Sequence, residues 1–199
     1  MDFSPGDLVL AGDSAGGQLI GALLVHLVHP SPYAPPLKVD GQFRAALFVS
    51  PFVRLPTKGG SYESNDGRDY IDRPQVDSFM ASWEVKSDEI WANLCGVGEA
   101  DDVWSKVFAG NSQGLVRNVM VTVGTAEILL DCCRVFAKEH VRAETVVATR
   151  DTDWKVFEGK GMVLVECEGE AHVQVALDSV VRYDKGVMAR AIGSWLPSV

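Results

Sequence analysis

The sequence predicts an α/β fold in which a mostly parallel sheet of about four to five strands is flanked by helices. Short runs of consecutive apolar residues, rather than alternating apolar and polar ones, indicate strands that are buried on both faces. Stretches with helical spacing separate these runs, so strands and helices alternate along the chain. With 199 residues, 47% of them hydrophobic, the chain is long enough to bury a core. We therefore expect a single domain over residues 1–199.

The first strand is predicted in the apolar run at residues 8–10, and a helix follows it. Leu19, Leu23 and Leu27 recur at helical spacing and form one apolar row of that helix. Four prolines between residues 30 and 36 then end the helix and produce a stiff loop. This order, strand then helix then loop, is the first unit of the predicted fold.

The later elements follow the same alternation. Residues 54–72 are polar and rich in glycine, which predicts a loop. Further strands are predicted at residues 45–49, 119–124, 145–149 and 162–165, and helices at residues 74–83, 87–94 and 128–141, with a last helix reaching towards Trp195.

Composition excludes several classes of function. The formal net charge of −9 argues against nucleic acid or an anionic membrane as a partner. The longest apolar run, around residues 19–28, is too short to span a bilayer, and the N-terminus lacks the features of a signal peptide, so a cytoplasmic protein is expected. No cysteine pair has metal-ligand spacing, so we expect no metal, no cofactor and four buried reduced thiols. The cysteines are Cys95, Cys132, Cys133 and Cys167.

The stretch after the first predicted strand holds the pattern Gly-x-Ser-x-Gly at Gly12, Ser14 and Gly16. This pattern is typical of a nucleophile elbow, a tight strand-to-helix turn that exposes a serine hydroxyl. Residues two before and two after the serine must be small because the strand and helix backbones nearly touch there, and Gly12 and Gly16 meet that need. The backbone N–H of Ala15 would point at a developing oxyanion.

A dinucleotide-binding turn is the competing interpretation, because Gly12, Ser14 and Gly17 also follow a strand and open a helix. That turn needs glycine at its middle position so that a pyrophosphate can approach, and Ser14 blocks it. No Lys-Ser or Lys-Thr pair follows, which excludes a phosphate-binding P-loop. Asp13, beside the serine, is expected to make local hydrogen bonds.

Ser14, Glu127 and His172 each lie a few residues past the end of a predicted strand. The carboxyl ends of parallel strands meet at one edge of a sheet, where α/β proteins place their chemistry. The order serine, acid, histidine is that of an α/β-hydrolase triad. His172 would act as general base towards Ser14, and Glu127 would orient the imidazole and stabilise its charged form.

Other titratable residues fit these roles less well. Asp131 lies one helical turn after Glu127 and is the alternative acid, but Glu127 directly follows the strand and has the shorter reach to His172. His140 lies late in a predicted helix among charged residues, a setting typical of solvated surface. His26 lies near a helix end and is expected to be a surface or dipole-pairing residue.

The elbow at residues 12–17 resembles that of the hormone-sensitive-lipase-like branch (α/β hydrolase fold-3) of the α/β-hydrolase superfamily. That branch also carries an Asp-x-Leu-x-Asp acid turn and a histidine after a short loop that contains glycine. The matching residues here are Glu127, Leu129 and Asp131 at the acid turn and Gly169 before His172. The stretch at residues 51–83 resembles fungal members, and the similarity covers essentially the whole chain.

The resemblance implies an α/β-hydrolase fold and a serine hydrolase that cleaves carboxylic esters of small molecules. Two departures stand out. Glu127 replaces the usual aspartate, and the chain has no His-Gly-Gly oxyanion motif, which the family carries before the elbow. We therefore expect the C-terminal portion of the full fold, truncated on its N-terminal side, with Ala15 as the remaining oxyanion donor. Losing one such donor costs roughly 10²–10³ in rate.

The missing segment has a second consequence, because the first strand would become an apolar edge of the sheet. Either the chain is incomplete, or a second copy in a homodimer or a partner chain covers that edge. The alternative function is a non-catalytic ligand-binding or interaction module on the same scaffold. Retention of Ser14 and His172 argues against this alternative, and the missing oxyanion motif argues for it.

Overall fold

The computed structural model describes residues 4–55, 59–83, 86–109 and 114–199. Within these residues, five strands form one sheet in the order β1-β2-β3-β5-β4, and every neighbouring pair is parallel. The strands are β1 (Val9–Asp13), β2 (Phe43–Val49), β3 (Val116–Gly124), β4 (Glu144–Ala148) and β5 (Met162–Cys167). The predicted α/β fold with a parallel sheet is confirmed.

Helices connect these strands in the expected alternation. They are α1 (Ser14–Val28), α2 (Ser61–Ser64), α3 (Arg73–Trp83), α4 (Ala100–Val107), α5 (Leu130–Val135), a π-helical continuation (Phe136–His140), α6 (Gln174–Val181) and α7 (Val187–Trp195). Single 3₁₀ turns lie at Pro5–Asp7, Trp154–Phe157 and Leu196–Ser198.

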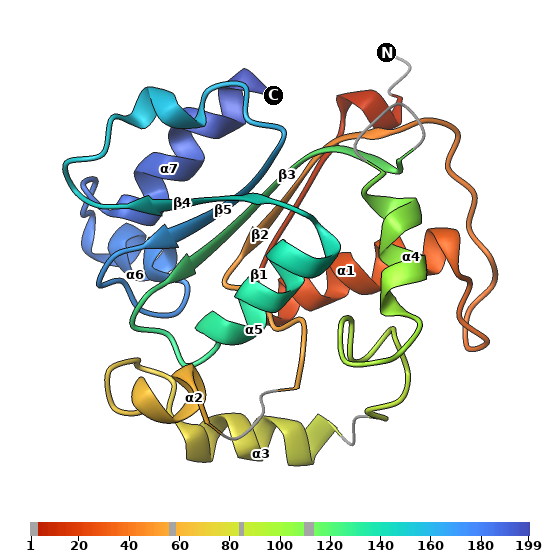
Figure 1. Ribbon diagram of the computed structural model, residues 1–199, viewed down its shortest axis with the longest axis horizontal. Coiled ribbons are helices and arrows are strands. Elements are labelled where there is room, and N and C mark those ends of the chain that lie inside the picture. Colours follow the sequence, from red (N-terminus) through yellow and green to blue (C-terminus); the bar gives the residue numbers. More distant parts are fainter. Residues whose placement is uncertain (1–3, 56–58, 84–85, 110–113) are drawn as a thin grey trace.

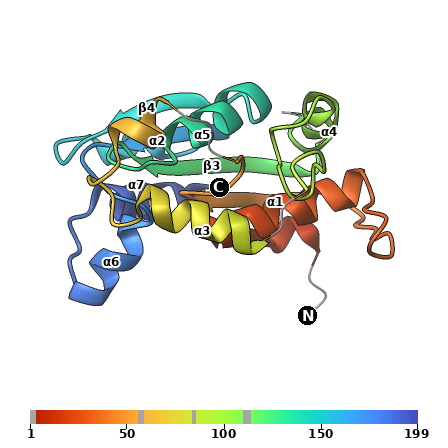
Figure 2. The ribbon, with the colours of Figure 1, turned by 90° about the horizontal axis from the view of Figure 1, so that it is seen from below.

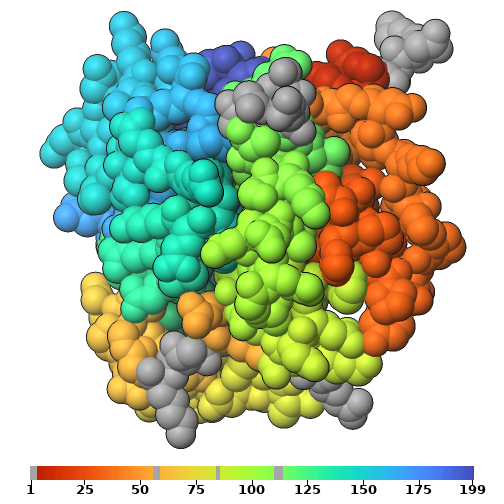
Figure 3. Space-filling model, turned by 45° about the vertical axis from the view of Figure 1, so that its right-hand side comes forward, coloured from red at the N-terminus to blue at the C-terminus, as the bar shows by residue number. Residues whose placement is uncertain are grey.

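Two helix predictions were wrong. Residues 87–94 form consecutive turns, because the N–H groups of Glu89 and Ala92 donate to carbonyls three residues earlier. The last helix is divided into α6 and α7, and Arg182 ends α6 in the left-handed conformation with φ of 58°. On the surface shown in Figure 3, these turns and α4 form the part that lies between α1 and α5.

Helices cover both faces of the sheet, with α4 and α5 on one side of β3 and α6 and α7 on the other (Figure 2). Successive strand residues point to opposite faces, so the sheet contributes to two core layers. The layer under α7 contains Ala45, Leu47, Val49, Met120, Val163, Met188 and Trp195. The layer under α1, α4 and α5 contains Leu24, Ala46, Phe48, Trp104, Val121 and Phe136.

Helices α2 and α3 lie beyond the carboxyl ends of the strands, at the bottom of Figure 1. At the sides of the sheet, β1 and β4 are the edge strands. Leu8 and Val9 are 44% and 36% exposed at the β1 edge. The apolar edge expected from the sequence is therefore seen, and its coverage by a second copy or a partner chain stays a prediction.

All four cysteines are buried and unpaired, and burial raises the pKa of the Cys132 thiol to about 11. In the described parts of the chain, no helix has both the length and the apolar character needed to cross a membrane.

Candidate active site

Ser14 is the first residue of α1 and follows directly on β1. Its φ is 45°, a left-handed conformation that is uncommon for residues other than glycine. Such strain persists only where neighbouring contacts hold it, and here the N–H of Phe52 donates to the Ser14 carbonyl at 3.0 Å. The end of β1 and the segment after β2 thus jointly define the turn that presents the serine.

The elbow glycines differ in why they are needed. A Cβ at Gly12 would lie 2.5 Å from the backbone of Gly16, so strand and helix do nearly touch there. A Cβ at Gly17 would lie 2.7 Å from Cβ of Pro51. A Cβ at Gly16 would meet only Asp13 Oδ1 at 3.4 Å, an ordinary contact. The size restriction predicted for Gly16 is therefore wrong, and it applies to Gly12 and Gly17.

His172 lies in the loop between β5 and α6 and is 4% exposed. Its Nε2 is 2.8 Å from Ser14 Oγ, and its Nδ1 is 3.1 Å from Glu127 Oε2. The ring of Tyr70 lies beside the imidazole, with 6.0 Å between the ring centroids. The three side chains that the sequence analysis singled out are thus brought together at the carboxyl ends of β1, β3 and β5.

Glu127 follows β3 and is fully buried. Burial raises its pKa, and hydrogen bonds from His172, Ser50 and the Gly124 N–H oppose that rise. Its Oε1 accepts from Ser50 Oγ at 2.6 Å and from the Gly124 N–H at 2.5 Å, which leaves Oε2 for the histidine. A carboxylate held this way can fix the imidazole tautomer and stabilise a proton taken up on Nε2.

Sequence reasoning missed Ser50, which lies directly after β2 with a φ of 45°. Its hydroxyl donates to Glu127 and accepts from the Val173 N–H at 3.0 Å, so it joins the acid to the residue after His172. A polar residue at the end of a buried strand, on the edge where the other site residues lie, was the signal that could have revealed it.

Asp131, the alternative acid, faces a different part of the molecule. Its Oδ2 accepts from the Ser61 N–H at 2.7 Å, and its Oδ1 lies 3.2 Å from Arg134 Nη1. Its side chain is 50% exposed. The geometry therefore favours Glu127 as the partner of His172.

A cavity of about 510 Å³ opens beside the serine. It is largely apolar, and the amide of its one lining glutamine, Gln18, already donates to the Trp91 carbonyl at 2.6 Å. Trp83 lines the cavity, whereas Trp104 is fully buried in the core. The lining residues are Ser14, Ala15, Gln18, Leu19, Phe52, Phe79, Met80 and Trp83.

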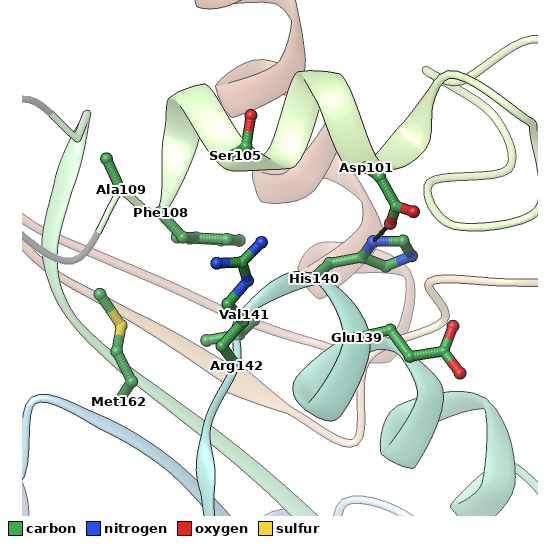
Figure 4. A pocket seen from close by; sticks show the side chains of 9 residues that line it. All are labelled: Asp101, Ser105, Phe108, Ala109, Glu139, His140, Val141, Arg142 and Met162. Carbon is green, nitrogen blue, oxygen red and sulfur yellow. Dashed lines mark ion pairs between the residues drawn. The ribbon is translucent and has the colours of Figure 1, made fainter.

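A larger cavity of about 820 Å³ is lined by His140 and, in the described part of the chain, shares no lining residue with the first (Figure 4). The His140 Nδ1 lies 3.0 Å from Asp101 Oδ1. His140 is only 7% exposed because Trp104 and Phe136 pack against it, so the solvated position predicted for it is wrong.

His26 is also buried, with Nε2 3.0 Å from the Pro35 carbonyl. In the described residues, no cluster of three or more potential ligands could hold a metal ion.

A parallel α/β sheet with a serine at a strand-to-helix turn, and a histidine and a carboxylate at the same edge, is the arrangement of α/β hydrolases. The chain belongs to that family, because a family model described as alpha/beta hydrolase fold matches residues 1–159. No curated protein is similar enough to match.

Several solved structures share the fold. They include a mutant of the esterase E40 (24% identity, TM-score 0.63), a hormone-sensitive lipase from a metagenome library (18%, 0.63) and carboxyl esterase 2 from the mycorrhizal fungus Tuber melanosporum (14%, 0.58). The first two matches each cover 98% of this chain and 55% of the other chain. The third covers 92% of this chain and 54% of the other chain. This chain therefore spans about half the length of these structures, and the fungal resemblance stays a prediction.

Proposed function

We propose that this chain is a serine hydrolase of the esterase type that cleaves carboxylic esters of small molecules. The observation that carries the proposal is the continuous hydrogen-bond relay from Ser14 Oγ through His172 to Glu127, which borders an apolar cavity. Esterases among the structures that share its fold add support.

In the proposed reaction, Ser14 Oγ attacks the ester carbonyl carbon while His172 Nε2 accepts the hydroxyl proton. The buried Glu127 carboxylate holds Nδ1–H and stabilises the imidazolium. His172 then returns the proton to the leaving alcohol, which forms an acyl-serine and free alcohol. A water molecule, deprotonated by the same imidazole, attacks the acyl carbon. The carboxylic acid is released, and His172 returns the proton to Ser14 Oγ.

The backbone N–H of Ala15 is the proposed oxyanion donor. Ala15 is the second residue of α1, and the first N–H groups of a helix have no acceptor within the helix. The positive end of the helix dipole favours negative charge at the same place. The developing oxyanion beside Ser14 would therefore meet a donor that needs little reorganisation.

The cavity beside Ser14 supports uncharged substrates. Phe52 and Trp83 approach each other with 6.0 Å between ring centroids, and both line the cavity. Among the residues that the structure describes, no Asp, Glu, Lys or Arg lines it. An apolar acyl or aromatic group can leave water there, whereas a charged group would lose hydration without gaining a partner.

The test is Ser14→Ala, assayed on 4-nitrophenyl acetate and butyrate and by labelling with a fluorophosphonate probe. We expect loss of turnover by roughly 10⁴-fold or more, together with loss of labelling. Ser105→Ala is the matched control, because Ser105 is exposed on α4 and its hydroxyl donates to the Asp102 carbonyl. Full turnover in Ser14→Ala would contradict the proposal, and an unlabelled wild-type protein would favour the non-catalytic binding module.

A further inference from the structure

The segment around α2 carries three buried polar side chains, Ser61, Asn65 and Asp69, which are 5%, 3% and 9% exposed. Ser61 begins α2, and Asn65 and Asp69 follow in the turns after it, each four residues further along the chain. All three form hydrogen bonds with backbone groups of the turn at residues 125–131, which contains Glu127.

Ser61 and Asn65 hold the acid turn along its length. The Ser61 hydroxyl donates to the Ile128 carbonyl at 3.0 Å and accepts from the Asp131 N–H at 3.0 Å. Asn65 Nδ2 donates to the carbonyl of Glu127 itself at 2.7 Å and to that of Thr125 at 3.1 Å. The backbone on both sides of the catalytic carboxylate is therefore fixed by α2 and the turn after it.

Asp69 makes a connection that the other two do not. Its Oδ2 accepts from the Ile128 N–H at 3.1 Å, and its Oδ1 accepts from the N–H of His172 at 3.0 Å. Oδ1 also accepts from the adjacent Tyr70 N–H at 2.9 Å. One carboxylate thus joins the residue after Glu127 to His172, although 103 positions separate Asp69 from the histidine.

The distance between Glu127 and His172 depends on how two turns, after different strands, lie relative to each other. Ser50 bridges them from the side of β2, and Asp69 bridges them from the side of α2. A carboxylate that accepts backbone N–H bonds forms stronger hydrogen bonds than a neutral acceptor. Removing Asp69 would leave the Ile128 and His172 N–H groups without this acceptor. The His172 imidazole would then be held less firmly in its orientation towards the Glu127 carboxylate.

We propose that Asp69 is a positioning residue that aligns the imidazole of His172 with Glu127 through the backbone of both turns. This inference rests on the proposed function, in which these two residues serve Ser14. Asp69 acts on the histidine and the acid and lines neither cavity described above. Its loss should therefore lower kcat and leave KM nearly unchanged.

Asp69→Ala and Asp69→Asn are the test variants, with ester hydrolysis measured on 4-nitrophenyl butyrate. We expect kcat to fall about 10²-fold in Asp69→Ala, the cost of misplaced reacting groups. The fall should be smaller in Asp69→Asn, which keeps one acceptor oxygen. Asp66→Asn is the matched control, because Asp66 lies on the same segment, pairs with Arg73 at 2.8 Å and, among the described residues, is bonded to neither turn. Its kcat should stay within about twofold of the wild-type value.

A second measurement does not depend on turnover. The proton on His172 Nδ1 that binds Glu127 should give a downfield proton NMR resonance in the wild-type protein, absent in His172→Ala. We expect that resonance to be weakened or lost in both Asp69 variants and kept in Asp66→Asn. An unchanged resonance and kcat in Asp69→Asn and Asp69→Ala, or equal losses in Asp66→Asn, would overturn the proposal. A wild-type protein that keeps the resonance but hydrolyses no ester would instead contradict the proposed function.

Discussion

Among the described residues, two buried histidines each lie beside a carboxylate, and one of them, His172, has the surroundings of a catalytic base. His172 Nδ1 is 3.1 Å from Glu127, and His140 Nδ1 is 3.0 Å from Asp101. The two pairs are alike in length and in the burial of the imidazole. They differ in hydrogen bonding, because Glu127 is hydrogen-bonded to His172 Nδ1, whereas neither ring nitrogen of His140 has a hydrogen-bond partner among the described residues. They also differ in the surroundings of each carboxylate and in what the imidazole reaches.

Glu127 is completely buried and bound by Ser50 and Gly124, whereas the Asp101 side chain is 82% exposed. His172 lies at the carboxyl ends of the strands and reaches Ser14. The His140 cavity is lined by Met162, the first residue of β5, so it lies at the amino ends of the strands. The serine that lines it, Ser105, points away from the imidazole (Figure 4). Of these two histidine–carboxylate pairs, the one at the edge where the elbow lies has a serine hydroxyl within hydrogen-bond distance.

The largest expected effect separates the two histidines directly. His172→Gln should lower kcat for a 4-nitrophenyl ester by roughly 10⁴-fold or more, because the general base is lost. His140→Gln should keep kcat within a few-fold of wild type. Steady-state kinetics on both variants measures this contrast. A similar loss in both would show that the two regions are functionally alike.

The next effect separates the carboxylates. Glu127→Gln should lower kcat by about 10⁴-fold, because an amide cannot stabilise the imidazolium or hold its tautomer. Asp101→Asn should have little effect on kcat, since the Asp101 carboxylate is exposed to solvent. Asp131→Asn tests the alternative acid on the same assay, and a larger loss there than in Glu127→Gln would reverse the assignment.

A smaller effect separates the cavities. Trp83→Ala should reduce kcat/KM for a butyrate ester about tenfold relative to an acetate ester, because the longer acyl chain loses apolar contact. Met162→Ala removes a comparable apolar side chain from the His140 cavity and should leave the ratio unchanged. Competition between the two esters gives the ratio in one experiment. An equal change in both variants would contradict an acyl site beside Ser14.

The smallest effect concerns stability. Burial lowers the pKa of His140, and Asp101 and Glu139 oppose that shift. The unfolded chain therefore binds the proton more readily, and this residue's contribution to stability is present above pH 6.5 and is lost as pH falls below it. Thermal unfolding between pH 8 and pH 5 should show a steeper loss for wild type than for His140→Gln. Parallel curves would mean that the imidazole is not buried as described.

The main elements of the fold could be predicted from local patterns. Apolar runs marked the strands because strands buried on both faces need them, and Leu19, Leu23 and Leu27 marked α1 by their spacing. The turns at residues 87–94 could not be distinguished from a helix, because the same residues suit both and the segment mixes i to i+3 hydrogen bonds with one helical i to i+4 bond, from Asn93 to Glu89. Helix α4 escaped notice because the pattern of its eight residues is too short to be distinctive.

The candidate site divides in the same way. Ser14, Glu127 and His172 were identified from residue type and from position after strands, since parallel strands bring their carboxyl ends to one edge. Ser50 and Asp69 were missed because their importance lies in distant partners: Ser50 binds groups 77 and 123 positions away, and Asp69 binds backbone N–H groups 59 and 103 positions away. The position of Ser50 at the end of a strand can be predicted locally, but no local pattern records its partners or those of Asp69.

Residue chemistry along the chain was thus sufficient for the sheet, the elbow and the three polar side chains at its rim. Three-dimensional packing decided that His140 is buried, that Glu127 and not Asp131 lies beside His172, and which groups hold the imidazole and the acid in place. The physical reason is range: strand and helix propensities act over a few neighbours, whereas the enclosure of an imidazole or a carboxylate depends on segments that meet only after the sheet has formed.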